Sequence, residues 1–161
     1  MLLNRKGEIL EAQIHDVAPS LILIPWEEVG DRDPVLGDNS AWGLDLPNTV
    51  SIDDVAVWLP HLSLVSIRFP SFSDGRGYSL ARKIRQRGYQ GILRARGPLI
   101  PDQFYYLTQC GFDEVELPDT SAQRQTSAQW RHALALRKGG YQEGYQEASS
   151  ILQARRKARA T

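Results

Sequence analysis

The stretch Leu64-Val-Ser-Ile-Arg-Phe-Pro-Ser-Phe-Ser-Asp-Gly-Arg-Gly-Tyr-Ser79 indicates the fold of this chain. Its first part, Leu64–Phe69, alternates apolar and polar residues as a β-strand does. A loop with two glycines follows, and a basic helix is expected from about Tyr78 to Arg87, with a stop at Gly88. A strand that leads through a tight loop into a helix is the repeating unit of a parallel α/β sheet.

Three further strand–helix units accompany this stretch. The expected strands are Trp42–Leu46, Gly91–Arg96 and Val115–Leu117. The expected helices run from a cap at Ser51 to Leu59, from Pro101 to Cys110, and over residues 121–138. Four such units in succession imply a parallel sheet with right-handed crossovers.

The N-terminal residues are expected to add β-structure outside these units. Leu2–Asn4 and Glu8–His15 flank Arg5-Lys-Gly7 as an antiparallel hairpin, and Leu21–Ile24 is a further strand. The sequence therefore predicts one α/β domain over residues 1–140. Its hairpin and first strand lie in 1–26 and its strand–helix units in 42–138, and a basic helical or frayed tail follows over 141–161.

Alternation along the expected strands divides the sheet into two faces. One face collects apolar residues and should carry the helices. The other face collects Asp45, Ser66, Arg68, Arg94, Arg96, Glu114 and Glu116. Because parallel sheets normally bury apolar residues on both faces, this charged face favours a half-barrel-like sheet with helices on the convex side only. A flat three-layer sandwich, with the N-terminal segment covering the charges, is the alternative.

Composition places the chain among soluble globular proteins of one domain. It has 161 residues, of which 42% are hydrophobic and 24% charged. A single cysteine excludes an internal disulfide and suits a reducing cytosol, and no apolar run reaches the length of a membrane helix. The start of the chain lacks the apolar core of a secretory signal, so we expect a cytoplasmic protein.

The net charge is zero, but the charges are segregated along the chain. Residues 1–60 carry 11 acids and 3 bases, whereas residues 68–97 carry 8 bases and one acid. Such blocks either steer an anionic ligand or partner, or neutralise one another in the fold. The basic tail lacks interleaved aromatic residues over 154–160, so we do not expect a nucleic-acid platform there.

The loop Asp74-Gly-Arg-Gly-Tyr-Ser79 lies where a parallel sheet gathers ligands, at the end of a strand and the start of a helix. Arg76 could clamp a sulfate, sulfite or phosphate oxygen in bidentate fashion. The candidate residues of the loop are Asp74, Gly75, Arg76, Gly77, Tyr78 and Ser79. The alternative is a structural turn, in which the glycines supply special backbone angles and Asp74 caps the helix.

Three arginines of the charged face extend this candidate site. Arg68, Arg94 and Arg96 point the same way, and they either bind an anion or pair with Asp45, Glu114 and Glu116. Both can hold, because paired arginines are kept rigid for a ligand. Asp102 and Gln103 open the next helix at the same end of the sheet, although Asp102 is equally well explained as a favourable charge at a helix N-terminus.

Metal, cofactor and nucleophilic chemistry have no support in the sequence. His15, His61 and His132 are scattered without ligand spacing, and Cys110 is expected to be a buried, inert thiol. The loop lacks the lysine and hydroxyl residue of a P-loop and the spacing of a dinucleotide fingerprint. No metal site and no cofactor are therefore predicted.

The run Phe69–Arg82, followed by Gly91–Ala95, Asp102-Gln103 and Cys110–Phe112, resembles the bacterial family called domain of unknown function nine hundred and thirty-four. Its members often carry the label of an oxidoreductase involved in sulfite reduction, which rests on neighbouring genes for sulfite reductase and cysteine biosynthesis. The matching positions are Asp74, Gly75, Arg76, Gly77, Tyr78, Ser79, Arg94, Asp102 and Gln103. Pro98 stands where the family usually has an acidic residue, and the extension after about Gly140 is longer than usual.

The resemblance implies a role in sulfur assimilation. The first hypothesis is an accessory protein of assimilatory sulfite reduction, which binds a small oxyanion (sulfite, sulfate or phosphate) or docks on the sulfite reductase hemoprotein. The surface around Arg76, Arg94 and Asp102 would carry this role. The alternatives are an oxidoreductase or transferase of the same pathway, and an assembly protein whose charged face is a homodimer interface. Whether the protein is an enzyme stays open at this point.

Overall fold

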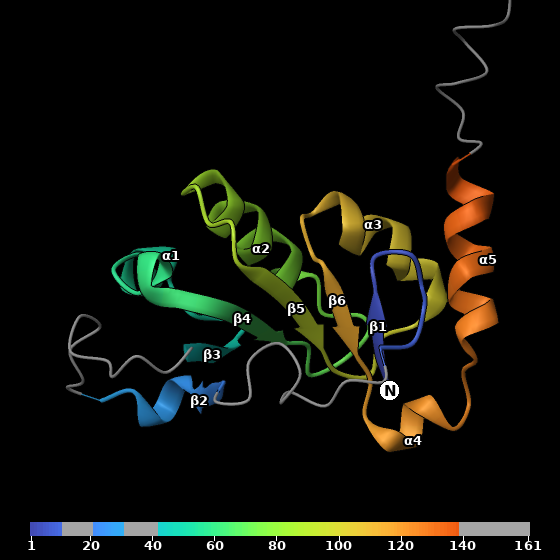
Figure 1. Cartoon of the computed structure of the whole chain (residues 1–161), viewed down its shortest axis with the longest axis horizontal. Helices are drawn as coiled ribbons and strands as arrows, with labels where there is room; N and C mark the ends of the chain where they lie inside the picture. Colours follow the sequence, from blue (N-terminus) through green and yellow to red (C-terminus); the bar gives the residue numbers. More distant parts are fainter. Residues whose placement is uncertain (11–20, 31–41, 139–161) are drawn as a thin grey trace, which may run out of the picture.

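A computed structural model of the chain describes residues 1–10, 21–30 and 42–138. The strands of this part form one six-stranded sheet in the order β1-β6-β5-β4-β3-β2 (Figure 1). They are β1 (Leu2–Asn4), β2 (Ile22–Pro25), β3 (Trp42–Pro47), β4 (Leu62–Arg68), β5 (Ile92–Arg96) and β6 (Glu114–Glu116). Strands β2 to β6 are parallel and adjacent in chain order, whereas β1 runs antiparallel to β6.

The helices follow the strands as the repeating pattern predicts. Helices α1 (Ile52–Ala56), α2 (Arg76–Gln86) and α3 (Phe104–Gln109) connect neighbouring parallel strands and lie along one side of the sheet (Figure 1). Helices α4 (Asp119–Ala122) and α5 (Ser127–Lys138) follow β6. The α/β class, with consecutive strand–helix units in a mostly parallel sheet, is confirmed, and the chain-order sheet with helices on one side agrees with the half-barrel-like arrangement.

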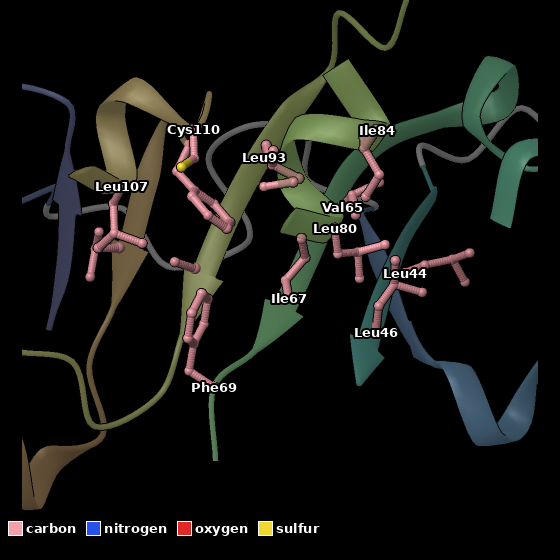
Figure 2. Packing of buried hydrophobic residues seen from close by; sticks show 14 of the residues in the cluster. Leu44, Leu46, Val65, Ile67, Phe69, Leu80, Ile84, Leu93, Leu107 and Cys110 are labelled. Carbon is pink, nitrogen blue, oxygen red and sulfur yellow. The ribbon is translucent and has the colours of Figure 1, made fainter. Parts of the chain in front are cut away.

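The apolar face of the sheet packs under α2 and α3. Figure 2 shows Leu80 and Ile84 of α2 among Val65, Ile67 and Leu93 of the sheet, and all five side chains are at least 95% buried. Each such residue contributes about 1.5–3 kcal/mol by leaving water. Cys110 lies in the same core and is buried, as the sequence predicted.

Two predicted elements differ from the structure in ways that have a physical reason. In the described part of the predicted hairpin, Leu3 is bridged to Ile9 and backbone bonds join Asn4 to Glu8 and Leu10 to Leu2; the unpredicted feature is that β1 also forms a ladder with β6 along its other edge. This pairing places the fully buried Leu3 in the main core. Most of the predicted second hairpin strand, Glu8–His15, lies outside the described residues.

The predicted helix over 121–138 is two helices, α4 and α5, separated by a turn. At that turn the Gln129 side-chain oxygen accepts a bond from the Thr126 N–H (2.8 Å), and Thr126 Oγ1 accepts from the Gln129 N–H (3.4 Å). This reciprocal pair is a capping box, which starts a new helix at Ser127. Ser51 caps α1 as predicted, its Oγ accepting from the Asp53 N–H at 3.3 Å, although α1 ends at Ala56.

One expectation concerns the C-terminal end of the chain. The predicted tail over 141–161 lies outside the described residues. Within residues 1–10, 21–30 and 42–138, no helix has both the length and the apolar character needed to cross a bilayer.

Candidate functional site

The polar face of the sheet carries a chain of ion pairs, which we call the charged ladder. Its members are Glu27, Asp45, Arg68, Arg94, Arg96, Glu114 and Glu116. Sheet register creates it, because Arg94 lies opposite Glu114 and Arg96 lies opposite Glu116 on the neighbouring strands. The alternative in which these arginines pair with strand carboxylates is therefore confirmed.

The buried end of the charged ladder is centred on Arg94. Its guanidinium lies 2.8 Å from Glu114 Oε2 and 3.2 Å from Glu116 Oε2, and only 1% of its side chain is exposed. Because Arg94 is enclosed and fully engaged by two carboxylates, it cannot present a guanidinium to a dissolved ligand. The sequence predicted that Arg94 contacts the ligand. In the structure it is buried and pairs with Glu114 and Glu116.

The exposed end of the charged ladder is centred on Asp45, which is 5% exposed. Asp45 Oδ2 lies 3.2 Å from Arg96 Nη1 and 3.5 Å from Arg68 Nε, and its other oxygen accepts a 2.7 Å bond from Ser66 Oγ. Arg68 and Arg96 keep 37% and 46% of their side chains exposed. The Asp45 carboxylate thus hydrogen-bonds the Arg96 guanidinium and lies near that of Arg68, and both guanidiniums are partly exposed at the end of the sheet.

A hollow of about 360 Å³ opens beside these two guanidiniums, and we call it the strand-end hollow. It is lined by Pro47, Asn48, Arg68, Phe69, Pro70, Arg96 and Gly97. Its walls come from the carboxyl ends of β3, β4 and β5 and the residues that follow them. Ligands of parallel α/β sheets bind at this end of the strands.

Two further lining residues give the strand-end hollow its shape and an additional donor. Gly97 has φ +148°, and a β-carbon there would lie 2.1 Å from the Phe69 carbonyl oxygen, so only glycine fits. Asn48 is 7% exposed, and its Nδ2 has no well-formed hydrogen bond among the described residues. The same side chain lowers the pKa of Asp74 through a hydrogen bond, so the amide lies beside that carboxylate and an acceptor on a ligand would share it with Asp74.

In the loop that follows β4, the two charged side chains, Asp74 and Arg76, pair with each other. Arg76 donates from Nε to Asp74 Oδ1 (3.0 Å) and from Nη2 to Asp74 Oδ2 (2.6 Å). These bonds, with a smaller contribution from the Asn48 side chain, hold the pKa of Asp74 well below its usual range. The same pair raises the pKa of Arg76. The predicted oxyanion clamp at Arg76 stays a prediction, and an oxyanion there would have to compete with Asp74.

Of the two glycines of this loop, Gly77 has a role in packing. Gly75 has φ −83°, and neither it nor Gly77 is among the positive-φ glycines of the described residues, so the predicted special backbone angles were wrong. A β-carbon at Gly77 would lie 2.4 Å from the Phe69 ring, so the glycine lets α2 approach the end of β4. Gly75, not Asp74, is the N-cap of α2, and Asp74 accepts the Arg76 N–H at 3.2 Å.

Of the remaining predicted residues, Gln103 connects two loops through hydrogen bonds, and Ser79 and Asp102 lie at the surface. Gln103 donates to the Phe72 carbonyl (2.6 Å) and to Tyr78 Oη (2.8 Å), which fastens the start of α3 to the loop before α2. Burial raises the pKa of Tyr78. Ser79 and Asp102 are exposed on their helices. Neither of these two side chains lines the strand-end hollow.

Two site residues were missed by sequence reasoning. Asn48 directly follows β3, so the rule that ligands gather at strand ends could have identified it. Glu27 pairs with Arg68 from a short 3-10 helix after β2, and no local pattern indicates that long-range contact. Within the described residues, no group of three or more His, Cys, Asp or Glu side chains is placed to hold a metal ion.

Comparison with protein families gives one match. A family model described as a bacterial protein of unknown function (DUF934) matches residues 43–152. This segment starts within β3 and therefore includes every lining residue of the strand-end hollow. Comparison with curated proteins gives no match.

Proposed function

We propose that this chain, which belongs to the bacterial DUF934 family of unknown function, binds a small sulfur oxyanion in the strand-end hollow. In this role it acts as an accessory protein of assimilatory sulfite reduction. The family resemblance implies the pathway, and the geometry of the hollow supports the ligand class. Sulfite and sulfate are oxyanions of the kind that guanidinium N–H groups bind, and Arg68 and Arg96 both line the hollow.

The observation that carries the proposal is the pair of accessible guanidiniums above one buried carboxylate. Asp45 accepts a hydrogen bond from Arg96 Nη1 with its carboxylate and one from Arg68 Nη2 with its backbone carbonyl, and Arg68 Nε has no hydrogen bond among the described residues. Guanidinium N–H groups suit oxyanions because two parallel donors match two oxygens. Side chains that are already ordered lose less conformational entropy when a ligand binds.

The carboxylates of the charged ladder limit the affinity. Glu27 contacts Arg68 at the surface, where the two side chains are 56% and 37% exposed. An oxyanion would displace Glu27, and an exposed pair of this kind contributes only about 0–1 kcal/mol. Glu116 and Asp45 remain nearby and repel an anion. We therefore expect a dissociation constant near 1 mM, equivalent to about 4 kcal/mol of binding free energy.

A thermal-stability assay with sulfite and sulfate at constant ionic strength tests the proposal. Ligand at about ten times its dissociation constant stabilises the native state by about 1.4 kcal/mol, which raises Tm by about 3–6 °C for a chain of this size. Arg96→Ala should remove this shift. Arg76→Ala is the matched control and should retain it, because Arg76 is paired with Asp74 and does not line the strand-end hollow. No shift in the wild type, or equal loss in both variants, contradicts the proposal.

A second candidate, docking on the sulfite reductase hemoprotein, is favoured by exposed aromatic residues beside the same loops. Phe72 is 56% and Tyr106 44% exposed, and the Tyr106 ring lies 4.8 Å from that of Tyr78. Apolar rings at a surface are typical anchors of protein interfaces. Co-purification with the hemoprotein should be lost with Phe72→Ser and retained with Val57→Ser, a control that is 60% exposed after α1. If both variants still co-purify with the hemoprotein, the surface at Phe72 is not the docking site.

A further inference from the structure

A second hollow lies near the β1 edge of the sheet, and β2 forms the opposite edge. It has a volume of about 730 Å³ and lies between the turn after β1, helix α3 and helix α5 (Figure 1). We call it the basic hollow. Its polar lining residues are Arg5, Lys6, Tyr105, Thr108, Gln109 and Arg131.

The turn that carries Arg5 and Lys6 is held firmly in place. Asn4 Oδ1 accepts from the backbone N–H groups of Lys6 (2.9 Å) and Glu8 (3.1 Å), which fixes the turn internally. Arg5 Nη2 donates to the Thr108 carbonyl of α3 at 3.2 Å. The backbone of the turn and the Arg5 side chain therefore have a defined position against α3.

Helix α5 supplies the third cation from the other side. Gly7 has φ +75°, and a β-carbon there would lie 3.1 Å from both Cγ and the backbone nitrogen of Arg131. The turn thus lies directly against α5 at Arg131. Phe104 of α3 and Trp130 of α5 pack edge to face with ring centroids 5.2 Å apart, which fixes the two helices that form the walls.

The charge balance of the basic hollow differs from that of the strand-end hollow. Arg68 and Arg96 each have carboxylate partners. Among the described residues, Arg5 has one distant partner, Asp113 at 3.6 Å, which also pairs with Arg85. Lys6 and Arg131 have no carboxylate within 4.0 Å in the described part of the chain. Among the described residues, an anion at Lys6 or Arg131 would displace no carboxylate, whereas at Arg5 it would compete with Asp113.

We propose that the basic hollow binds the phosphate group of a small phosphorylated molecule. Arg5, Lys6 and Arg131 would contact the phosphate oxygens, because ammonium and guanidinium groups form short charge-assisted bonds to them. Tyr105 and Leu134 of the same hollow would contact the uncharged part of the molecule. The volume of the basic hollow lies in the range of small-molecule sites, roughly 300–1,000 Å³.

Calorimetric titration of the full chain with phenyl phosphate, inorganic phosphate and phenol tests this site. We expect phenyl phosphate to bind, inorganic phosphate to bind more weakly because it cannot use Tyr105 and Leu134, and phenol not to bind. Lys6→Gln and Arg131→Gln should each weaken phenyl phosphate at least tenfold. Arg87→Gln is the matched control and should leave binding unchanged, because Arg87 pairs with Asp53 of α1, far from α5 (Figure 1).

The outcomes separate this site from the strand-end hollow. Arg96→Ala should leave phenyl phosphate binding unchanged, so loss of one site does not imply loss of the other. If inorganic phosphate binds as tightly as phenyl phosphate, the site stands and its ligand is free phosphate. If Arg131→Gln alters the circular dichroism spectrum, Lys6→Gln decides, because Lys6 is an exposed turn residue. Absence of binding at about 10 mM phenyl phosphate, a binding free energy under about 3 kcal/mol, overturns the proposal. Unchanged affinity in Lys6→Gln also overturns it.

Discussion

Replacing Arg94 with methionine would leave the Glu114 carboxylate buried without the guanidinium that neutralises it. Arg94 is 1% exposed, and it is bonded to Glu114 at 2.8 Å and to Glu116 at 3.2 Å. Removing one partner of a buried ion pair costs about 3–5 kcal/mol. We expect the lower end, about 3 kcal/mol, because the Glu116 side chain keeps 26% of its surface in water and can rehydrate.

Urea unfolding followed by tryptophan fluorescence measures this loss. With a slope of about 2 kcal/mol per M, a loss of about 3 kcal/mol lowers the midpoint by about 1.5 M. The double variant Arg94→Met/Glu114→Gln should recover at least about 1 kcal/mol relative to Arg94→Met, since no unpaired charge remains at position 114. A loss below about 1 kcal/mol in Arg94→Met, or no recovery in the double variant, would refute the reasoning that Arg94 neutralises buried charge.

Two further predictions concern packing and ionisation. Gly77→Ala should destabilise the fold by about 1–3 kcal/mol, because the added carbon would meet the Phe69 ring at 2.4 Å. Gly75→Ala, whose carbon would lie 3.8 Å from Tyr78, should stay within about 0.5 kcal/mol of wild type, and equal losses in urea unfolding would contradict the packing role of Gly77. Burial, with a smaller contribution from Asp113, raises the pKa of Tyr89. The Tyr89 contribution to stability is therefore complete below the unfolded pKa of about 10 and is lost as pH rises above it. Tyr89→Phe should make the fall in stability above pH 10 shallower, and an unchanged slope would contradict the assignment.

Local patterns predicted the sheet well because period-two alternation depends on backbone geometry alone. Asp45, Arg94 and Glu114 fall on one face, as alternation requires, and the consecutive strand–helix units produce strands adjacent in chain order. The partner of β1 could not be predicted in this way. In the structure β1 is bridged to Ile9 on one edge and paired with β6 on the other, and no local pattern indicates the second pairing, which accompanies the packing of Leu3 into the core.

The sequence predicted the positions of two arginines of the strand-end hollow but not the contacts around them. The sequence placed Arg68 and Arg96 at strand ends, and both line the strand-end hollow. It could not show that Arg94 is enclosed, because burial depends on which distant segments cover a face. Nor could it decide whether Arg76 faces a ligand or Asp74, since both residues lie in one short loop whose backbone path sets the answer. The capping box at Thr126 and Gln129 was readable from spacing alone and was overlooked.

The most direct test of the central proposal is a nuclear magnetic resonance titration that follows the arginine Nε–Hε signals during addition of sulfite. We expect saturable chemical-shift changes at Arg68 and Arg96 with a dissociation constant near 1 mM, and little change at Arg76 and Arg87. Signals of Arg68 and Arg96 that stay unmoved through the millimolar range, or shifts confined to Arg5 and Arg131, would contradict it.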